Sequence, residues 1–596
     1  MAFHKAVEPS PIVSGQPDTE KTGQASHFEH AEVMTPLGVE DGKLTKETIL
    51  AFIALCGQIN AYIMTLLIPS TTLPYIIADL GPDPNYPWIT ITWTLGAAII
   101  VSIGGRLSDI FGRRYFMITG ALLSIIGTIV GATGQSINQM IASGVLFGLG
   151  SGFQELCYAC VQEVVPNRWR VHAVGLLDLS NLIAFSSPVI SYVFIAFQPI
   201  GWRGAYWYMF SFHVFAFVLL FFFYNPPDFE MKHRNEGVSR LRLLAQIDWF
   251  GVFLFAAAAV LFLLGLNFGG RTYPWKHPGT LVPLIVGLLL FVASGFWAAY
   301  NNLKYPLFPR KLFRKVREFD MVIVVTFVGG TLYYSMNVLW PKQSQVLFIG
   351  PNDVILRGVY AVIFSTGTWL AAVITVFICS RLHHEKWQLI GFTIVQTALI
   401  ASMASVGIDD KAQAIAVVIL AATSITPPQL LSFTMLSFGI QDQEDMGIAC
   451  GLGSTFRLLG GSIATALYTA IYTNKFNEAL PGEMRNAIAD SGVAYSDSLL
   501  VSLIKAGTTN TVAAYNAVQG ATPELITLAE KATKLAYVKG FSLVYLISIA
   551  FGVAAIGAAA CTVSVDRSKK NNARAVVLKN EIHEDDSMES KVVKSI

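Results

Sequence analysis

Long apolar runs separated by short polar connections dominate this chain. A run of about 20 residues is enough for a helix to cross a bilayer. An even number of crossings would place both chain ends on the same side. The pattern predicts fourteen membrane-spanning helices, at approximately 49–73, 88–104, 115–134, 138–163, 172–197, 204–224, 248–268, 280–300, 319–341, 355–379, 387–407, 411–436, 446–472 and 536–563.

Composition supports this reading and excludes other classes. Of 596 residues, 53% are hydrophobic and only 13% charged, which is too apolar for a soluble protein of this length. The net charge of +2 gives no basic surface for a nucleic-acid partner. Lys and Arg concentrate in alternate short connections, and such connections face the cytoplasm. We therefore expect a multi-pass protein of the plasma membrane with both termini in the cytoplasm.

The runs divide into two groups of six around an additional pair. The fold class expected is all-α, with two six-helix halves plus an inserted pair, and such repeats place substrate between the halves near the membrane midplane. The polar connection 473–535 would be an external loop, either a polar cap or a lid. The expected parts are a disordered cytoplasmic tail 1–46, an N-terminal half 47–224, a linker with two inserted helices 225–318, a C-terminal half 319–565 and a cytoplasmic tail 566–596.

A short charged connection follows the second run and reads G-R-L-S-D-I-F-G-R-R over residues 105–114. Asp109 and Arg113 are four residues apart and can pair across one helical turn. The two glycines permit a tight turn and close backbone approach. A cytoplasmic turn that merely carries positive charge is the alternative. The spacing therefore singles out Gly105, Asp109, Gly112, Arg113 and Arg114 as a candidate functional set.

Three charged residues fall inside apolar runs, where an ionisable group is a functional candidate. Glu155 and Asp178 lie about eight or nine residues from the cytoplasmic ends of neighbouring spans, or roughly 12–14 Å deep. At equal depth they could share a proton. Local hydrogen bonds to Asn181, Gln154 or an arginine are the alternative. Arg457 could balance the carboxylates or bind substrate, so all three are proton-coupling candidates.

Other polar and aromatic residues in the runs could line a substrate cavity, although each is individually as consistent with packing. The candidates are Gln58, Asn60, Tyr62, Trp93, Tyr333, Tyr334, Asn337, Trp369 and Gln429.

The sequence contains no clear motif for redox, metal, nucleotide or catalytic chemistry. The spacing of Cys157 and Cys160 occurs in redox proteins, but within an apolar run these residues are expected to serve packing. There is no metal-ligand spacing, no nucleotide-binding G-x-x-x-x-G-K-[ST] loop and no nucleophile–base set. We therefore expect neither a cofactor nor an enzymatic activity, and the oligomeric state stays open.

Glycines recur at four-residue intervals in two of the runs. They are Gly127 and Gly131 in the third run, and Gly144, Gly148 and Gly152 in the fourth. Small residues on one face allow membrane helices to approach backbone to backbone. This spacing predicts close packing of both helices.

The connection 105–114 resembles the cytoplasmic signature of the major facilitator superfamily, and further motifs resemble its fourteen-span drug:proton antiporter branch. The residues of these motifs are most similar to those of fungal trichothecene efflux pumps. The motifs are Gly201-Trp202-Arg203, Asp248-Trp249-Phe250-Gly251, Pro306-Leu307-Phe308, Trp88-Ile89-Thr90, Trp93-Thr94-Leu95-Gly96 and Leu339-Trp340-Pro341-Lys342-Gln343. The resemblance implies a major facilitator fold and proton-driven transport. It also implies a conformational latch that steadies the outward-facing state, formed by Gly105, Asp109, Gly112, Arg113 and Arg114.

Two positions depart from the antiporter pattern. Gly144 stands where family members often have an arginine, and residues 186–191 keep Pro188 but not the usual glycines. Related siderophore-iron importers show similar departures. The expected function is proton-coupled efflux of a small hydrophobic fungal secondary metabolite, a trichothecene-type toxin, by a protein embedded in the lipid bilayer, which would protect the producing cell from its own toxin. A siderophore-iron importer of the same fold, or a non-transporting receptor, is the alternative.

Overall fold

The computed structural model describes residues 44–565 and Leu578, apart from residues 82, 84, 87, 228–239, 270–272, 304, 351–352, 383, 439–444 and 491–495. The predicted cytoplasmic tails lie outside the described residues, except for 44–46 and Leu578. The described part is helical throughout, with two isolated β-bridges, Ile247 to Tyr305 and Gly269 to Tyr273. It forms no extended strand, so the all-α polytopic fold predicted from the sequence is confirmed.

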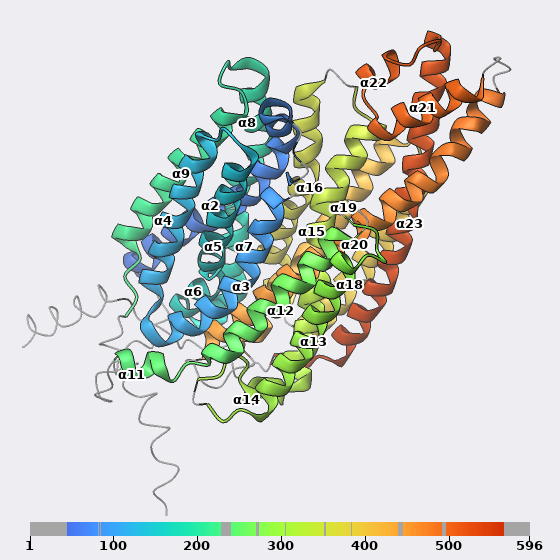
Figure 1. Ribbon diagram of the computed structural model, residues 1–596. Helices are drawn as coiled ribbons and strands as arrows, with labels where there is room; N and C mark the ends of the chain where they lie inside the picture. The colour runs from blue at the N-terminus through green and yellow to red at the C-terminus, as the bar shows by residue number, and fades with distance from the viewer. Residues whose placement is uncertain are drawn as a thin grey trace, which may run out of the picture. The chain divides into compact units, whose positions relative to one another are not determined.

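The first six predicted spans are all present as helices (Figure 1). Two of them consist of two consecutive helices rather than one. They are α2 (Lys46–Leu80), α3 (Trp88–Phe111), α4 (Arg113–Ala132), α5 (Ile137–Gln154) with α6 (Cys157–Val164), the 3₁₀ turn η2 (Asn167–Trp169) with α7 (Arg170–Leu179) and α8 (Leu182–Phe197), and α9 (Trp202–Phe223).

The remaining predicted spans are also present as helices. The region predicted to be inserted comprises α11 (Arg240–Ala245), α12 (Trp249–Phe268), α13 (Pro278–Tyr300) and α14 (Arg310–Phe313). The rest comprises η3 (Val316–Asp320), α15 (Met321–Leu347), α16 (Val354–Ile374), η4 (Thr375–Cys379), α17 (Ser380–Leu382), α18 (Glu385–Ser402), η5 (Met403–Ser405), α19 (Lys411–Phe438), α20 (Met446–Asp490), α21 (Asp497–Thr509), α22 (Val512–Asn516) and α23 (Pro523–Cys561).

Thirteen described helices are long and apolar enough to cross a membrane. Of the described helices that cover the fourteen predicted spans, only α20, at the thirteenth, falls outside this group. Glycine, serine and threonine residues, together with Arg457, lower its average hydropathy. Its 45 residues are far more than a crossing needs. The segment predicted as an external loop is largely helical, because α20 and α23 both extend into it and α21 and α22 pack between them (Figure 1).

Close helix packing occurs where the glycine spacing predicts it. A Cβ atom at Gly148 would lie 2.7 Å from the carbonyl oxygen of Trp93, and one at Gly96 would lie 3.0 Å from Gly148 itself. A Cβ atom at Gly144 would reach the Ile89 carbonyl. Helices α3 and α5 therefore touch through their backbones. Gly144, which departs from the antiporter pattern, serves this packing.

Two spans are interrupted beside their intramembrane carboxylates. Helix α5 ends just before Glu155, and α7 ends just after Asp178. At the second interruption Asn60 donates to the Ser180 carbonyl and accepts from the Ala184 amide, at 3.1 and 3.0 Å. Backbone groups freed inside a membrane must find such partners. Asn60 thus stabilises the interruption.

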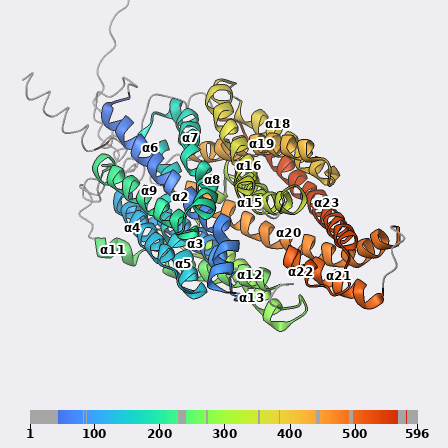
Figure 2. The same ribbon diagram turned by 90° about the horizontal axis from the view of Figure 1, so that it is seen from above.

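The inserted helices α12 and α13 lie side by side in both views (Figures 1 and 2). Asp248 joins their ends on the side of the latch connection. Its carboxylate accepts hydrogen bonds from the Gly251 amide at 2.8 Å, from Trp297 Nε1 at 2.9 Å and from Asn301 Nδ2 at 3.3 Å. One buried side chain therefore caps α12 and anchors the end of α13.

We expect Asp248→Ala to lower the free energy of unfolding by about 1–3 kcal/mol, because three donors lose their acceptor. Thermal unfolding of the purified protein in detergent measures this. The control is Asp83→Ala, which removes a carboxylate that accepts a backbone hydrogen bond from Asn85 outside the core. Equal unfolding temperatures for the two variants would contradict the assigned role of Asp248.

Candidate functional site

A buried ion pair joins the two predicted halves. Arg457, on α20, donates to Glu155 at the interruption between α5 and α6, with an N···O distance of 2.6 Å. The Glu155 side chain is fully buried and that of Arg457 is 6% exposed. Charges at this depth are costly unless they are paired. The sequence predicted both residues as candidates, and the structure brings them into contact.

Tyrosines and a glutamine surround this pair. Tyr62 donates to Glu155 at 3.3 Å and lies 3.2 Å from the hydroxyl of Tyr334. Arg457 also donates to Gln429 at 3.4 Å, and its guanidinium lies over the rings of Tyr334 and Phe433. Three of the predicted cavity residues, Tyr62, Tyr334 and Gln429, therefore cluster at the pair.

Arg457 retains unused hydrogen-bonding capacity. Its Nε atom is buried and has no hydrogen-bond partner among the described residues. A guanidinium has five N–H donors. The site can thus offer a donor to another acceptor, such as an oxygen atom of a small molecule.

Asp178 has partners of its own. It accepts hydrogen bonds from Tyr158 at 2.7 Å and from Asn181 at 3.1 Å. The Tyr158 ring stacks on Phe433, with centroids 5.0 Å apart, and lies next to Arg457. Asp178 and Glu155 are therefore held in one connected polar cluster through Tyr158 and Arg457, each by a different set of donors.

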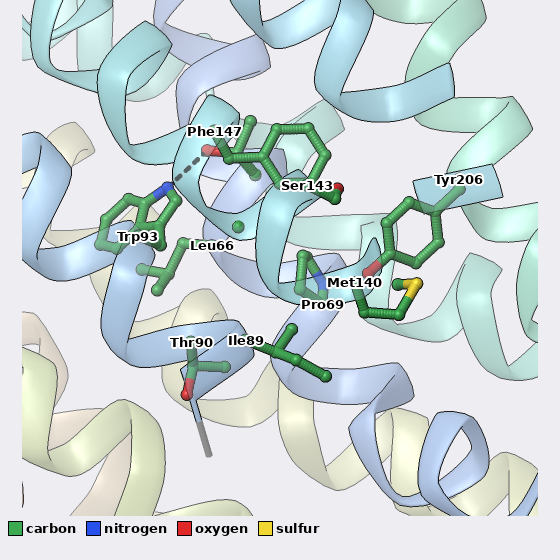
Figure 3. Close-up of a pocket in the computed structure, with 11 residues that line it drawn as sticks. Leu66, Pro69, Ile89, Thr90, Trp93, Met140, Ser143, Phe147 and Tyr206 are labelled. Atoms are coloured by element: carbon green, nitrogen blue, oxygen red, sulfur yellow. Dashed lines mark hydrogen bonds between the residues drawn. The ribbon is translucent and has the colours of Figure 1, made fainter. Parts of the chain in front are cut away.

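Trp93 lies at the edge of this cluster, between α2, α3 and α5. Its ring nitrogen donates to Thr65 at 2.9 Å, the dashed bond in Figure 3, and to Ser151 at 3.0 Å. Its ring centroid lies 6.0 Å from that of Tyr62. The hollow beside it holds about 10 Å³ and is lined by residues such as Leu66, Ile89 and Tyr206 (Figure 3). A hollow of this size holds at most one water molecule.

The other predicted cavity residues have separate surroundings. Gln58 bonds to the Ala216 carbonyl and to Gln154, within the first half. Asn60 supports the interruption after α7. Asn337 donates to the carbonyl of Tyr333 on its own helix, and Tyr333 packs against Tyr334 and Phe364. Trp369 donates to the Leu179 carbonyl at 3.0 Å, across the two halves.

The predicted ion pair between Asp109 and Arg113 is present, and a third charged residue, Glu163, joins it. Arg113, the first residue of α4, donates to Asp109 near the end of α3 at 3.0 Å, so the pair spans the turn at Gly112 rather than one turn of a continuous helix. Arg113 also binds both carboxylate oxygens of Glu163 at the end of α6. All three side chains are buried. The bidentate geometry is the strongest arrangement available to an arginine and a carboxylate.

The latch also reaches the second half of the protein. Asp109 accepts a hydrogen bond at 2.8 Å from the Ile448 amide, in the first turn of α20. A carboxylate is favourable there because free amide groups and the helix dipole both attract it. Arg106 donates to Asp445 at 3.0 Å, and Lys311 binds the same carboxylate. Charged contacts therefore hold α3 against the start of α20.

Glycines allow this contact to form. A Cβ atom at Gly105 would lie 2.7 Å from the Gly447 carbonyl oxygen, and one at Gly447 would collide with Asp109. Gly112 has a φ angle of +93°, which a glycine adopts without strain, at the turn from α3 to α4. Arg114 donates to the carbonyls of Phe221 and Tyr224 at the end of α9. Arg114 thus fastens the latch connection to the first half.

Sequence reasoning did not identify Glu163, Asp445 or Gly447 as part of the latch. Glu163 lies at the end of an apolar run and Asp445 just before one. Acidic residues at the ends of spans on the predicted basic side were the available signal, because a latch arginine needs a buried counter-charge.

Comparison with known proteins finds similarity over nearly the whole chain. The family described as "Fungal trichothecene efflux pump (TRI12)" matches residues 13–592. The trichothecene efflux pump TRI12 of Fusarium sporotrichioides is 26% identical over 93% of this chain and 91% of that protein. Its namesake from Trichoderma arundinaceum is 29% identical over 83% of each chain.

Two further matches extend the comparison. The MFS-type transporter prx5 of Penicillium rubens is 27% identical over 89% of this chain and 94% of that protein. Among solved structures, the proton:xylose symporter XylE aligns over 86% of this chain and 94% of that chain, with 14% identity and a TM-score of 0.49. The family match covers nearly the whole chain, including the latch and the buried ion pair. The chain therefore belongs to the fungal trichothecene efflux pump family.

Proposed function

We propose that this protein is a secondary transporter of the plasma membrane that exports a hydrophobic fungal metabolite in exchange for protons. The substrate class proposed is a trichothecene-type sesquiterpenoid, as the names of the relatives suggest. The observation that carries the proposal is the buried Glu155–Arg457 pair, which joins the two halves at the interruption of a membrane span.

The pair supplies a way to couple proton and substrate. A proton on Glu155 neutralises its charge and removes the attraction that holds Arg457. The guanidinium then needs another acceptor, because an unpaired charge inside a membrane is costly. A substrate oxygen can take that place at Arg457, next to Gln429. Proton and substrate thereby favour different states of the same pair, and Asp178 is the second candidate for the proton.

The surroundings of the pair suit a compact, mostly apolar molecule. Aromatic rings of Tyr62, Trp93, Tyr158, Tyr334 and Phe433 cluster there, and Arg457 is the cation among them. A sesquiterpenoid with a few oxygens needs apolar contact and a small number of placed hydrogen bonds. Opening of the two halves would widen this region into the substrate cavity.

The latch is proposed to set the balance between the two access states. Its contacts join α3 to α20 at the end of the spans that carries most of the loop arginines. Engaged contacts there close the cytoplasmic side and favour the outward-facing state. Release of Asp109 from Ile448 and of Arg106 from Asp445 would open that side to substrate.

The proposed orientation has both termini in the cytoplasm and α21 and α22 outside. A protease-cleavable tag inserted at Gly520, in the exposed turn between α22 and α23, should be cut in intact cells. Tags at either terminus should be cut only after the membrane is permeabilised. The reverse pattern of cleavage would contradict the orientation.

Expression in a toxin-sensitive yeast that lacks its own exporters tests the proposed function. Cells with the wild-type protein should accumulate less trichothecene and tolerate more of it than cells with Glu155→Gln. Equal accumulation in the two strains, with equal protein at the cell surface, would rule out toxin export as the activity.

A further inference from the structure

A second hollow lies between the inserted helices and the second half. It has a volume of about 830 Å³ and is contributed by α12, α13, α14, α15 and α20. The volume falls within the range of sites that hold a drug-sized ligand. Its wall is strongly aromatic, formed by Phe255, Phe262, Phe291, Phe308, Phe313, Phe327 and Phe456 together with Leu459 and Ile463. We refer to it as the side chamber.

The side chamber has an apolar interior and a basic end. Phe262 lies 13 residues into α12, which corresponds to about 20 Å along the helix. At the other end lie Arg310 and Arg314. Arg310 is engaged with the last carbonyls of α13, including that of Ala298 at 3.1 Å. Arg314 is exposed and forms no side-chain hydrogen bond or ion pair within the described part of the chain.

This basic end belongs to the same side of the membrane as the latch. Lys311, between the two arginines, binds the latch carboxylate Asp445, and Arg106 lies over the ring of Tyr305. In the proposed membrane placement the arginines would lie near the headgroups of that leaflet, and Phe255, Phe262 and Phe291 on the spanning helices would lie among its acyl chains.

The outer side of the wall formed by α13 is apolar and exposed, as expected of a helix that faces lipid. Its outward side chains are largely exposed, with Leu289 at 61% and Phe296 at 62%. A ligand can therefore enter the side chamber sideways from the membrane. A basic group above an apolar cavity matches the two ends of an acidic lipid, because clustered Lys and Arg near the membrane surface attract anionic headgroups.

We propose that the side chamber is a binding site for an acidic phospholipid from the leaflet on the latch side. The phosphate pairs with Arg314, and an acyl chain fills the phenylalanine-lined space between the inserted pair and α20. A neutral metabolite would have no use for the unpaired Arg314, which is why a lipid is favoured over the transported molecule. Only the assignment of the leaflet as cytoplasmic rests on the proposed orientation.

Native mass spectrometry of the purified full chain tests this site, with dioleoyl phosphatidylserine and dioleoyl phosphatidylcholine as the probes. We expect one phosphatidylserine to be retained at concentrations at which phosphatidylcholine is lost. Arg314→Gln should weaken phosphatidylserine retention about fivefold, since one basic residue near a surface is worth about 1 kcal/mol. The matched control is Arg381→Gln, which removes an exposed arginine elsewhere and should have no effect.

A second variant tests the cavity itself. A Cβ atom at Gly295 meets no other atom within 4 Å, so Gly295→Trp can project into the side chamber without a backbone clash. It should abolish retention of phosphatidylserine. Gly391→Trp is the control, because that glycine is equally open but lies on α18, outside the chamber.

Three results would overturn the proposal. They are equal retention of the two lipids, equal effects of Arg314→Gln and Arg381→Gln, and unchanged retention in Gly295→Trp. Displacement of phosphatidylserine by a trichothecene would instead identify the side chamber as a substrate site. None of these outcomes depends on transport activity, so the lipid site and the proposed function can fail separately.

Discussion

Replacement of Glu155 by glutamine is expected to abolish uphill transport and to destabilise the protein. The variant leaves Arg457 buried without its counter-charge. Removing one partner of a buried ion pair costs about 3–5 kcal/mol. Arg457→Gln should have a similar effect, because it leaves the fully buried Glu155 carboxylate without its cation. Thermal unfolding in detergent and whole-cell efflux of labelled toxin measure the two consequences.

The double variant Glu155→Gln/Arg457→Gln separates stability from transport. Two amides at these positions carry no charge and can bond to each other or to Gln429. The double variant should therefore recover much of the lost stability and still fail to concentrate substrate against a gradient. Asp178→Asn provides a comparison within the same cluster, since its partners Tyr158 and Asn181 are neutral. Uphill transport by the double variant would show that the proton is carried elsewhere.

Replacement of Asp109 by asparagine is expected to leave the protein in the membrane but to reduce transport severely. Asparagine still has an oxygen for the Ile448 amide, but it loses the charge that holds Arg113 and favours the start of α20. A coupling energy of this type is typically about 1–3 kcal/mol. Such a change shifts the balance between the two access states by roughly 5- to 150-fold. Efflux rates, normalised to the protein present at the cell surface, measure the effect.

Two further variants serve as a comparison and a control for Asp109→Asn. Gly447→Ala should reproduce the defect without altering any charge, because a Cβ atom there collides with Asp109. Asp409→Asn is the matched control, since Asp409 is exposed in the connection before α19. Normal efflux by both Asp109→Asn and Gly447→Ala would reduce the motif to a positively charged turn.

The membrane spans could be predicted because each one must satisfy the same physical requirement. A stretch that crosses a bilayer as a helix has to be long and apolar, and that requirement is written locally in the sequence. The span containing Arg457 met it least well, yet its helix is the longest of those described. The helix interruption at Glu155 could not be foreseen, because no proline or glycine stands at residues 154–158. Pro188, an obvious breaker, lies inside α8 instead.

The candidate site was predictable only as far as single residues. Charges at membrane depth are rare and costly, so Glu155, Asp178 and Arg457 could be recognised from their positions. Their pairing could not, since 302 residues separate Glu155 from Arg457 and helix packing alone brings them together. For the same reason, Glu163 and Asp445 could not be assigned to the latch from the sequence. Asp109 and Arg113 were found because they are only four residues apart in the sequence, although the structure places them on either side of the turn at Gly112 rather than on one helix.

Uncharged polar residues were harder to assign. Gln58, Asn60 and Gln429 all occur in apolar runs, but only Gln429 contacts the ion pair. Asn60 stabilises a helix interruption, and Gln58 bonds within the first half. An amide side chain can be satisfied by any nearby carbonyl, so its presence in a span indicates a buried hydrogen bond without indicating which one.

Transport by the purified protein in lipid vesicles tests the central claim most directly. Vesicles with the cytoplasmic side of the protein facing outward would be given labelled trichothecene and an interior more acidic than the medium. The account predicts that wild-type protein concentrates the toxin inside, that a protonophore stops this, and that Glu155→Gln vesicles only equilibrate or remain empty. Accumulation that is unaffected by the protonophore, or equal in wild-type and Glu155→Gln vesicles, would contradict proton-coupled export through this ion pair.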